Sequence, residues 1–462
     1  MLALTTQSGI TALLGMCTTS LSAVALRART VVVAVITLTL SQALHAAPAT
    51  GMHASPSSVS IVHVGHLIAD ASQAPASEFS LVIDGERIVS VEQGYLAAAD
   101  LPEPLGQRVS GVIDLKDSWV LPGLIDVHVH FAPSDKLHLV TKSDAYLATM
   151  AIANARKTLH AGFTTVRDLG SPGALVHSVR DGINDGLIEG PRILSAGQIL
   201  SKTGAHADLS NGYRPDFSGL MQHRSYQCVG AHECERKVLQ IAAQGANVIK
   251  VVADRSVTAE GPVDFNDAEF SAIVDTAKRL GLGVAVHAHT EAAAAAALRA
   301  GVRSLEHGTF ANAESFMLMK EADAYYSPTL SAFVAIKASL AQYPPAVQAQ
   351  FAPAVENIGA ALRTARDTGV KIVLGTDAGV IPHGSNASEL EAMMTHGGLS
   401  AQEAMIAATQ AAADLLGMSD QVGTLKPGAY ADFVAVADNP LETITVLQTP
   451  QAVMKGGRMV LQ

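Results

Sequence analysis

Apolar runs of strand length alternate with amphipathic runs of helix length through the middle of the chain. The strand candidates lie at residues 120–128, 164–169, 192–200, 247–253, 283–289, 304–309, 325–330 and 371–378. Helix-like runs separate them, including 267–281 and the alanine-rich 290–300. Eight such units over about 300 residues are typical of a parallel α/β barrel. The sequence therefore predicts an α/β protein with a (β/α)8 TIM-like barrel over residues 120–420.

A doubly wound open sheet is the alternative architecture for the same alternation. Such a sheet normally carries a glycine-rich phosphate-binding turn after an early strand. The sequence has no such turn, and this favours the barrel.

Strict alternation of apolar and polar residues, which is typical of half-buried strands, appears on both sides of the barrel region. In residues 60–119 it surrounds Asp84-Gly85, and in residues 421–462 it surrounds Gly456-Gly457, both of which are hairpin signals. Neither segment has enough strands to bury a core alone. We therefore expect the two segments to pair into one small β-sandwich domain built from both ends of the chain.

Residues 1–46 have the pattern of a secretory signal peptide. Arg27 and Arg29 are their only charged residues, an apolar stretch follows at 30–40, and small residues then surround Ala46. A basic start, a short apolar core and a small-residue exit favour export to the periplasm or the medium, and an uncleaved anchor is the alternative. We expect no membrane attachment after the signal is removed.

Charge and cysteine content restrict the classes of partner and compartment. The 462 residues carry a formal net charge of −11 and no basic cluster, so nucleic acid is not an expected partner. Cys17 belongs to the signal segment, which leaves Cys228 and Cys234 six positions apart. In an oxidising compartment these two could form a disulfide, and two free thiols are the equal alternative.

Residues able to bind a metal lie at the ends of several predicted strands. They are His128 and His130, Lys250, His287 and His289, Glu306 and His307, and Asp377. The carboxyl ends of barrel strands meet at one mouth, where barrel active sites lie. Side chains at positions i and i+2 of a strand share a face, so the first two histidines point the same way. The joint pattern predicts a metal centre at the mouth.

Not every polar residue at these ends is expected to face the centre. Glu306 directly precedes His307, and adjacent strand residues point to opposite faces. We therefore predict that Glu306 points away from the barrel interior and has a structural role.

The chain resembles the amidohydrolase superfamily. The resemblance rests on Pro122-Gly-Leu-Ile-Asp-Val-His128-Val-His130, Lys250, His287, His307 and Gly375-Thr-Asp377. The best match is the binuclear branch with a bridging lysine, in the prolidase-like and imidazolonepropionase-related group. Within that group the chain is similar to the ochratoxin-hydrolysing amidohydrolases, in which His-Ala-His is followed by Glu-His-Gly in the next unit.

This resemblance implies a specific metal site. Two Zn²⁺ ions per subunit, or other divalent metals, would be held by His128, His130, Lys250, His287, His307 and Asp377. A protonated lysine is a poor ligand, so Lys250 would carry carbon dioxide as a carbamate. Asp377 would also be catalytic, taking a proton from the nucleophile and giving it to the leaving amine. Of the two histidines at the fifth strand, the family pattern favours His287 as the ligand.

Other residues are candidates for binding the substrate. His289 would line the pocket or orient a ligand, and a plain hydrogen-bonded rim histidine is the alternative. His206, on the loop after the third strand, could contact the substrate or stabilise an oxyanion. Tyr213, Arg214 and Arg255 are candidate partners for a substrate carboxylate, because the guanidinium of arginine matches carboxylate geometry.

The sequence predicts an exported binuclear zinc amidohydrolase acting on a small-molecule amide. We expect it to cleave the bond to a C-terminal amino acid, as a carboxypeptidase does, with N-acyl amino acids or ochratoxin A as the type of substrate. An Xaa-Pro or Xaa-Arg dipeptidase, a lactone, ester or phosphotriester hydrolase, and a catalytically inactive binding protein are the alternatives. Relatives form homo-oligomers, so an assembly up to an octamer is expected.

Overall fold

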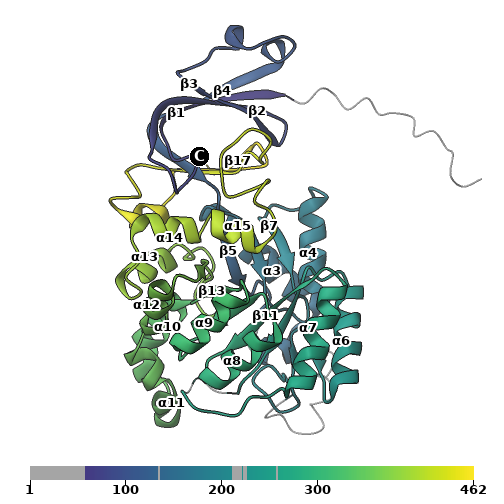
Figure 1. Cartoon of the computed structure of the whole chain (residues 1–462). Coiled ribbons are helices and arrows are strands. Elements are labelled where there is room, and N and C mark those ends of the chain that lie inside the picture. Colours follow the sequence, from purple (N-terminus) through teal and green to yellow (C-terminus); the bar gives the residue numbers. More distant parts are fainter. Residues whose placement is uncertain are drawn as a thin grey trace, which may run out of the picture. The chain divides into compact units, whose positions relative to one another are not determined.

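A computed structural model describes residues 58–133, 136–210, 221, 226–255, 257 and 259–461 (Figure 1). The predicted signal segment, 1–46, lies outside the described residues. Within them, no helix is both long enough and apolar enough to cross a membrane.

Parallel strands from two sheets form the barrel. The first sheet has the order β5 (Leu124–Val129), β6 (Phe163–Asp168) and β7 (Arg192–Ser195). The second has the order β14 (Lys371–Ile372), β13 (Tyr325–Ser327), β12 (Ser304–His307), β11 (Gly283–Ala288), β10 (Val248–Val252), β8 (Leu200–Ser201) and β9 (Tyr226–Gln227). The strand pairs within both sheets are parallel.

Backbone hydrogen bonds join both edges of the first sheet to the second sheet. On one side, the Asn247 amide donates to the Ser195 carbonyl at 2.8 Å. On the other, the Val127 amide donates to the Leu374 carbonyl at 2.9 Å, and the Asp377 amide donates to the His128 carbonyl at 2.8 Å. The sheets therefore close on themselves, and the predicted barrel is confirmed.

Helices cover the outside of the strands (Figure 1). The α-helices are α2 (Lys136–Thr141), α3 (Asp144–His160), α4 (Leu175–Asn184), α6 (Ala231–Ala243), α7 (Asp267–Arg279), α8 (Glu291–Ala300), α9 (Ala313–Glu321), α10 (Leu330–Ser339), α11 (Pro345–Glu356), α12 (Ala360–Thr368), α13 (Ser388–Thr395), α14 (Ala401–Ala407) and α15 (Gln410–Leu415). In α8, Ala293, Ala294 and Ala297 are fully buried, so small side chains let this helix pack closely against its neighbours.

A separate seven-stranded sheet contains strands from both ends of the described chain. It consists, in spatial order, of β17 (Arg458–Leu461), β16 (Ala452–Lys455), β15 (Phe433–Val436), β4 (Val109–Pro122), β1 (Val59–Leu67), β2 (Ala76–Asp84) and β3 (Arg87–Gln93). Ile83 and Ile88 from one edge share a buried cluster with Phe433 and Met454 from near the other. The sheet therefore packs on itself as a small sandwich, and both predicted hairpins, β2–β3 and β16–β17, are antiparallel pairs.

Short 3-10 helices lie in the connections of this domain and near α10. They are η1 (Ala98–Asp100), η2 (Gly106–Arg108), η3 (Leu340–Gln342) and η4 (Ile444–Gln448).

Cys228 and Cys234 form a disulfide that ties the end of β9 to the first turn of α6. This decides between the two alternatives that the sequence left open. The Cys228 amide also donates to the Ser201 carbonyl at 3.1 Å, next to the loop that follows β8. The disulfide therefore fixes α6 against the strand edge that leads into this loop.

We predict that replacing both Cys228 and Cys234 by alanine lowers the free energy of unfolding by about 2 kcal/mol, because a seven-residue loop is then open in the unfolded chain. Urea denaturation of the oxidised wild type and the double variant measures the difference. Adding a reductant should lower the free energy of unfolding of the wild type to that of the variant, and should leave the value of the variant unchanged. Equal stability of both proteins without reductant would contradict a stabilising role.

Candidate metal centre

Two histidines and an aspartate form a cluster at the barrel mouth. His128 lies in β5, His130 directly follows it, and Asp377 follows β14. The Asp377 carboxylate lies 3.2 Å from His130 Nε2 and 3.5 Å from His128 Nε2. Two ligands at zinc distances of 2.0–2.2 Å with tetrahedral angles are about 3.4 Å apart. The three side chains thus have the spacing of a set that shares one ion.

The turn that carries Asp377 is bound by the buried carboxylate of Asp126. Asp126 accepts hydrogen bonds from Thr376 Oγ1 at 2.6 Å, from Asn386 Nδ2 at 2.8 Å and from the His128 amide at 3.0 Å. Asp377 itself has a left-handed backbone, with a φ of 58°. Asp126 therefore links the first and last barrel strands next to His128 and Asp377, the residues that could bind a metal.

Three more histidines form a second cluster beside the first. His287 belongs to β11, His289 follows it and His307 ends β12, and one nitrogen of each lies within 4.8 Å of the others. His307 has a left-handed φ of 68°. The structure therefore places both His287 and His289 where a metal could be held, and does not separate the two as the family pattern did.

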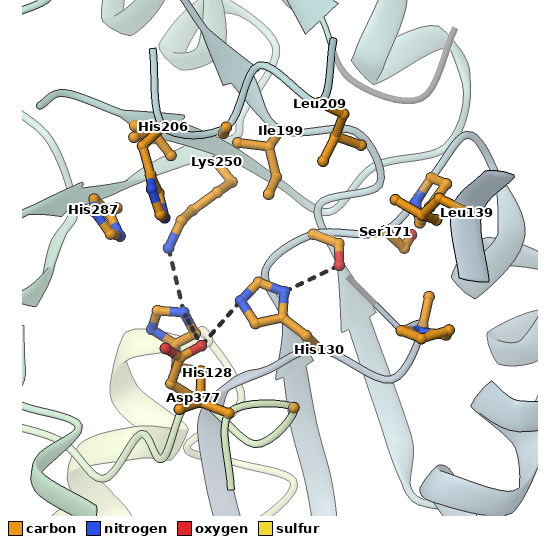
Figure 2. Close-up of a pocket in the computed structure, with 18 of the residues that line it drawn as sticks. His128, His130, Leu139, Ser171, Ile199, His206, Leu209, Lys250, His287 and Asp377 are labelled. Atoms are coloured by element: carbon orange, nitrogen blue, oxygen red, sulfur yellow. Dashed lines mark hydrogen bonds and ion pairs between the residues drawn. The ribbon is translucent and has the colours of Figure 1, made fainter. Parts of the chain in front are cut away.

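Lys250, in the middle of β10, lies at the first cluster and is almost completely buried (Figure 2). Its Nζ is 3.4 Å from His128 Nε2. Burial lowers the pKa of this amine to about 8. Only a neutral amine can react with carbon dioxide, so the surroundings favour the reactive form.

The nitrogens that face away from the centre are hydrogen-bonded. Nδ1 of His128 donates to Glu306 at 3.0 Å, and Nδ1 of His130 donates to the Gly170 carbonyl at 3.1 Å. His289 and His307 share hydrogen bonds through Nδ1 with the Thr309 and Thr329 hydroxyls, at 2.8 and 2.7 Å. Such outer partners fix the ring so that Nε2 points inward, as in metal-ligating histidines. The residues present therefore fit a divalent metal site.

Glu306 corrects one expectation, because it points into the barrel and not away from it. Its carboxylate accepts hydrogen bonds from Arg167 Nη2 at 2.7 Å and Ser304 Oγ at 2.6 Å, besides that from His128. Ser304 and Glu306 share the inner face of β12, whereas Leu305 lies in the outer core. The alternation ends at His307. Its left-handed backbone lets its own side chain point to the mouth, as that of Glu306 also points inward.

Burial and neighbouring charges set the protonation states of the donors. Burial, with Lys250 nearby, lowers the pKa of His128 to about 4, and burial holds the pKa values of His287 and His307 well below the usual range. Burial alone would raise the pKa of Asp377, but its bond to His130 holds that pKa well below its ordinary value. Burial alone would lower the pKa of His130, but its bond to Asp377 raises that pKa. The neutral imidazoles of His128, His287 and His307, beside an ionised carboxylate, are the forms that bind metals.

The two clusters open into a cavity of about 310 Å³. Its wall includes His128, His130, Lys250, His287, His307 and Asp377, which are the six residues predicted to bind metal. A cavity of this size at the carboxyl ends of barrel strands is where substrates bind in this fold.

The residues predicted to bind substrate differ in where the structure places them. His289 is buried in the second cluster and does not line the cavity. His206 lines the cavity, and its ring stacks on that of His287 with centroids 5.2 Å apart. Arg255 does not line it: its side chain is half exposed and pairs with Asp264 at 2.5 Å, because the preceding Asp254 holds the chain against the start of α8. Tyr213 and Arg214 lie outside the described residues.

Sequence reasoning missed several groups that support the site. Arg167, in β6, donates to the Val127 carbonyl at 2.7 Å as well as to Glu306. Asp254 accepts from the His289 and Thr290 amides at 2.7 and 2.8 Å, and its other oxygen lies 3.7 Å from His287 Nε2. A charged residue within an apolar strand run, as in Thr-Thr-Val-Arg167, was the available signal for the first.

Comparison with known proteins agrees with this geometry. The model of the amidohydrolase family matches residues 119–460, and the chain belongs to that family. It is 32% identical to the ochratoxinase of Aspergillus niger over 427 residues, covering 87% of this chain and 86% of that protein.

Two further relatives extend the comparison. A solved structure described as a Xaa-Pro dipeptidase with bound methionine has a TM-score of 0.79 and 36% identity, covering 87% of this chain and 99% of that one. The imidazolonepropionase of Ralstonia nicotianae is 25% identical over 408 residues, covering 80% of this chain and 90% of that protein. The chain is a hydrolase acting on carbon–nitrogen bonds, in a family that is typically metal-dependent.

We predict that Glu306→Gln weakens metal binding about 10- to 100-fold, because His128 loses the carboxylate that orients it. Leaving Arg167 buried without its charge partner should also cost about 3–5 kcal/mol of stability. Metal titration and urea denaturation measure the two effects. Glu314→Gln, at an exposed position in the first turn of α9, is the matched control and should change neither.

The stability part of this prediction depends on pH. Burial alone would raise the pKa of Glu306, but the charge of Arg167 and the bond from His128 hold it well below its ordinary value. A depressed carboxyl pKa stabilises the fold above the unfolded pKa, about 4.3, and that stability is lost as the pH falls further. The difference between wild type and Glu306→Gln should be constant from about pH 6 to 8 and narrow below about pH 4. A difference that grows in acid would contradict the ion pair.

Proposed function

We propose that this chain is a two-metal amide hydrolase, with zinc as the metal, that releases a C-terminal amino acid from an N-acyl amino acid. The proposal rests on two donor clusters, His128–His130–Asp377 and His287–His289–His307. All of these residues except His289 line one cavity, together with Lys250. Six family-pattern donors suit two ions better than one.

The proposed roles follow from position. His128, His130 and Asp377 would hold one ion, and His287 and His307 the other, with Lys250 bridging as a carbamate. When bound, a pair of divalent ions supplies a nucleophile at neutral pH and polarises the amide carbonyl. His289 does not line the cavity and is bound through Nδ1 to Thr309, so it would support the second group of donors from behind.

Asp377 would also move the proton. Its carboxylate is ionised and lies at the cavity wall, so it can accept a proton from the nucleophile. The protonated Asp377 would then give this proton to the amide nitrogen as the carbon–nitrogen bond breaks, because an amide anion is too basic to leave.

Similarity to relatives supports the choice of substrate. The ochratoxinase and the Xaa-Pro dipeptidase are related over most of their lengths. We therefore propose N-acyl amino acids, with ochratoxin A as one example, and a dipeptidase as the second candidate. We also propose export and a homo-oligomer. The disulfide supports export, because such bonds persist in oxidising compartments.

A panel of N-acyl amino acids and dipeptides, with matched esters and lactones, tests the reaction class. The zinc-loaded protein is incubated with each compound, and amine release is measured by chromatography. Hydrolysis of amides that end in a free amino acid is the expected result. Turnover of esters or lactones alone would assign the site to that reaction, and no turnover of any compound would favour a binding protein.

We predict that Asp377→Asn lowers kcat at least about 100-fold, because the amide cannot accept the proton. The variant should retain part of its metal through His128 and His130. Steady-state kinetics and metal analysis of the same sample separate the two effects. Asp438→Asn, at an exposed position outside the cavity, is the matched control. A kcat near that of the wild type would exclude Asp377 as the proton carrier.

We predict that ¹³C-labelled bicarbonate gives a carbamate signal in the NMR spectrum of the wild type and none in Lys250→Ala. The variant should also lose the second metal, and short carboxylic acids should restore part of it by replacing the carbamate oxygens. The same labelled signal in the variant would place the carbamate elsewhere.

A further inference from the structure

The two sides of the cavity differ in chemistry (Figure 2). On the side of the second cluster, His206 stacks on His287. The rest of the described wall beyond the donors is formed by Gly170, Gly379, Ser171 and nine apolar residues, namely Ala132, Pro133, Leu139, Pro172, Ile199, Ala207, Leu209, Val252 and Val380. The Ser171 hydroxyl is the polar side-chain group of this part of the wall. In Figure 2, Leu139, Ile199 and Leu209 lie on the side of His130. These three define the apolar wall.

Two of the three residues of the apolar wall, Leu139 and Leu209, belong to or pack against a small buried cluster. Leu139 packs with Leu147 and Met221 in a small buried cluster, and Leu175 and Leu209 pack against it. This cluster is separate from the large core between strands and helices. Leu139 and Leu147 therefore pack with each other beside the cavity and not within the barrel core.

The apolar wall reaches the first metal cluster through a glycine. A Cβ on Gly170 would lie 2.5 Å from Ile199 Cδ1 and 3.4 Å from His130 Cε1. Ile199 can approach the imidazole edge of His130 because residue 170 has no side chain. A ligand that covers the imidazole of His130 therefore lies close to Ile199.

Charge restricts what can bind on each side. Among the described lining residues, the ionisable groups are Asp377, Lys250 and the histidines. A charged substituent against Leu139, Ile199 and Leu209 would lose its water, and these three side chains offer it no opposite charge, which is costly. A carboxylate is better placed on the opposite side, where the exposed imidazole of His206 can donate to it.

We propose that the acyl half of the substrate carries a bulky uncharged group that sits on Leu139, Ile199 and Leu209, and that the amino acid half extends toward His206. The proposal rests on the proposed amide hydrolysis. The two halves of an amide leave the scissile bond in opposite directions, so placing the carboxylate near His206 places the acyl group over His130. Selectivity then lies in the acyl group and depends little on the amino acid side chain.

Two substrate series test this orientation. The first lengthens a straight acyl chain from acetyl to hexanoyl on one amino acid, and the second varies the amino acid under one acyl group. We expect kcat/KM to rise about three- to fourfold for each added methylene in the first series, from the transfer energy of a buried methylene. The second series should vary much less.

Variants of the apolar wall provide the matched test. Ile199→Asn should flatten the dependence on acyl length, as should Leu209→Asn, which serves if the first variant does not fold. Leu187→Asn, at a highly exposed position outside the cavity, is the control and should keep the wild-type slope. The proposal would be overturned if kcat/KM varied mainly with the amino acid, or if both variants kept the wild-type dependence of kcat/KM on acyl length. Either result would leave amide hydrolysis intact.

Binding of the carboxylic acid products separates this proposal from the reaction itself. Calorimetry on the zinc-loaded protein with acids from acetate to hexanoate needs no turnover. Affinity that rises with chain length in the wild type, and not in Ile199→Asn, supports the apolar wall even if no amide is cleaved. Affinity independent of chain length would overturn it.

Discussion

The buried Glu306 carboxylate is the interaction on which the arrangement of the metal centre depends. It lies inside the barrel with Arg167 on one oxygen and His128 on the other. Arg167 in turn binds the Val127 carbonyl of the first strand. An ion pair at this depth is stable only when its remaining polar atoms are also bound, and here Ser304 binds both members. Strands one, two and six are thereby fixed relative to one another directly beneath the donors.

Backbone strain at the mouth has the same purpose. His307, Thr329 and Asp377 all have left-handed backbones although none is glycine. Such conformations cost about 1–3 kcal/mol each and persist only where surrounding contacts enforce them. Glu389 supplies some of these contacts, since it accepts the Leu330 and Ser331 amides at 2.8 and 2.6 Å beside Thr329. At His307 and Asp377 the left-handed backbone belongs to a donor of the centre, and at Thr329 it belongs to the hydrogen-bond partner of His307.

The sequence predicted the barrel and the donor positions because both follow from simple periodicities. Parallel strands buried on both faces are continuous apolar runs, and their polar ends mark the mouth. The inward direction of Glu306 could not be predicted in this way, since alternation places it opposite His307 and only the positive φ of that histidine breaks the rule. The prediction that Arg255 binds substrate was wrong for a similar reason. Arg255 pairs with Asp264 because of how the loop folds, which local sequence does not encode. The apolar wall depends on contacts between α2, α3 and a distant loop.

We propose that these strand ends hold two metal ions in one site. Metal analysis of the purified wild-type chain tests it most directly, after loading with zinc and removal of unbound ions by gel filtration. We expect about two zinc ions per chain, since six donors at one cavity are more than a single tetrahedral ion requires. One tightly bound ion, or none, would contradict it.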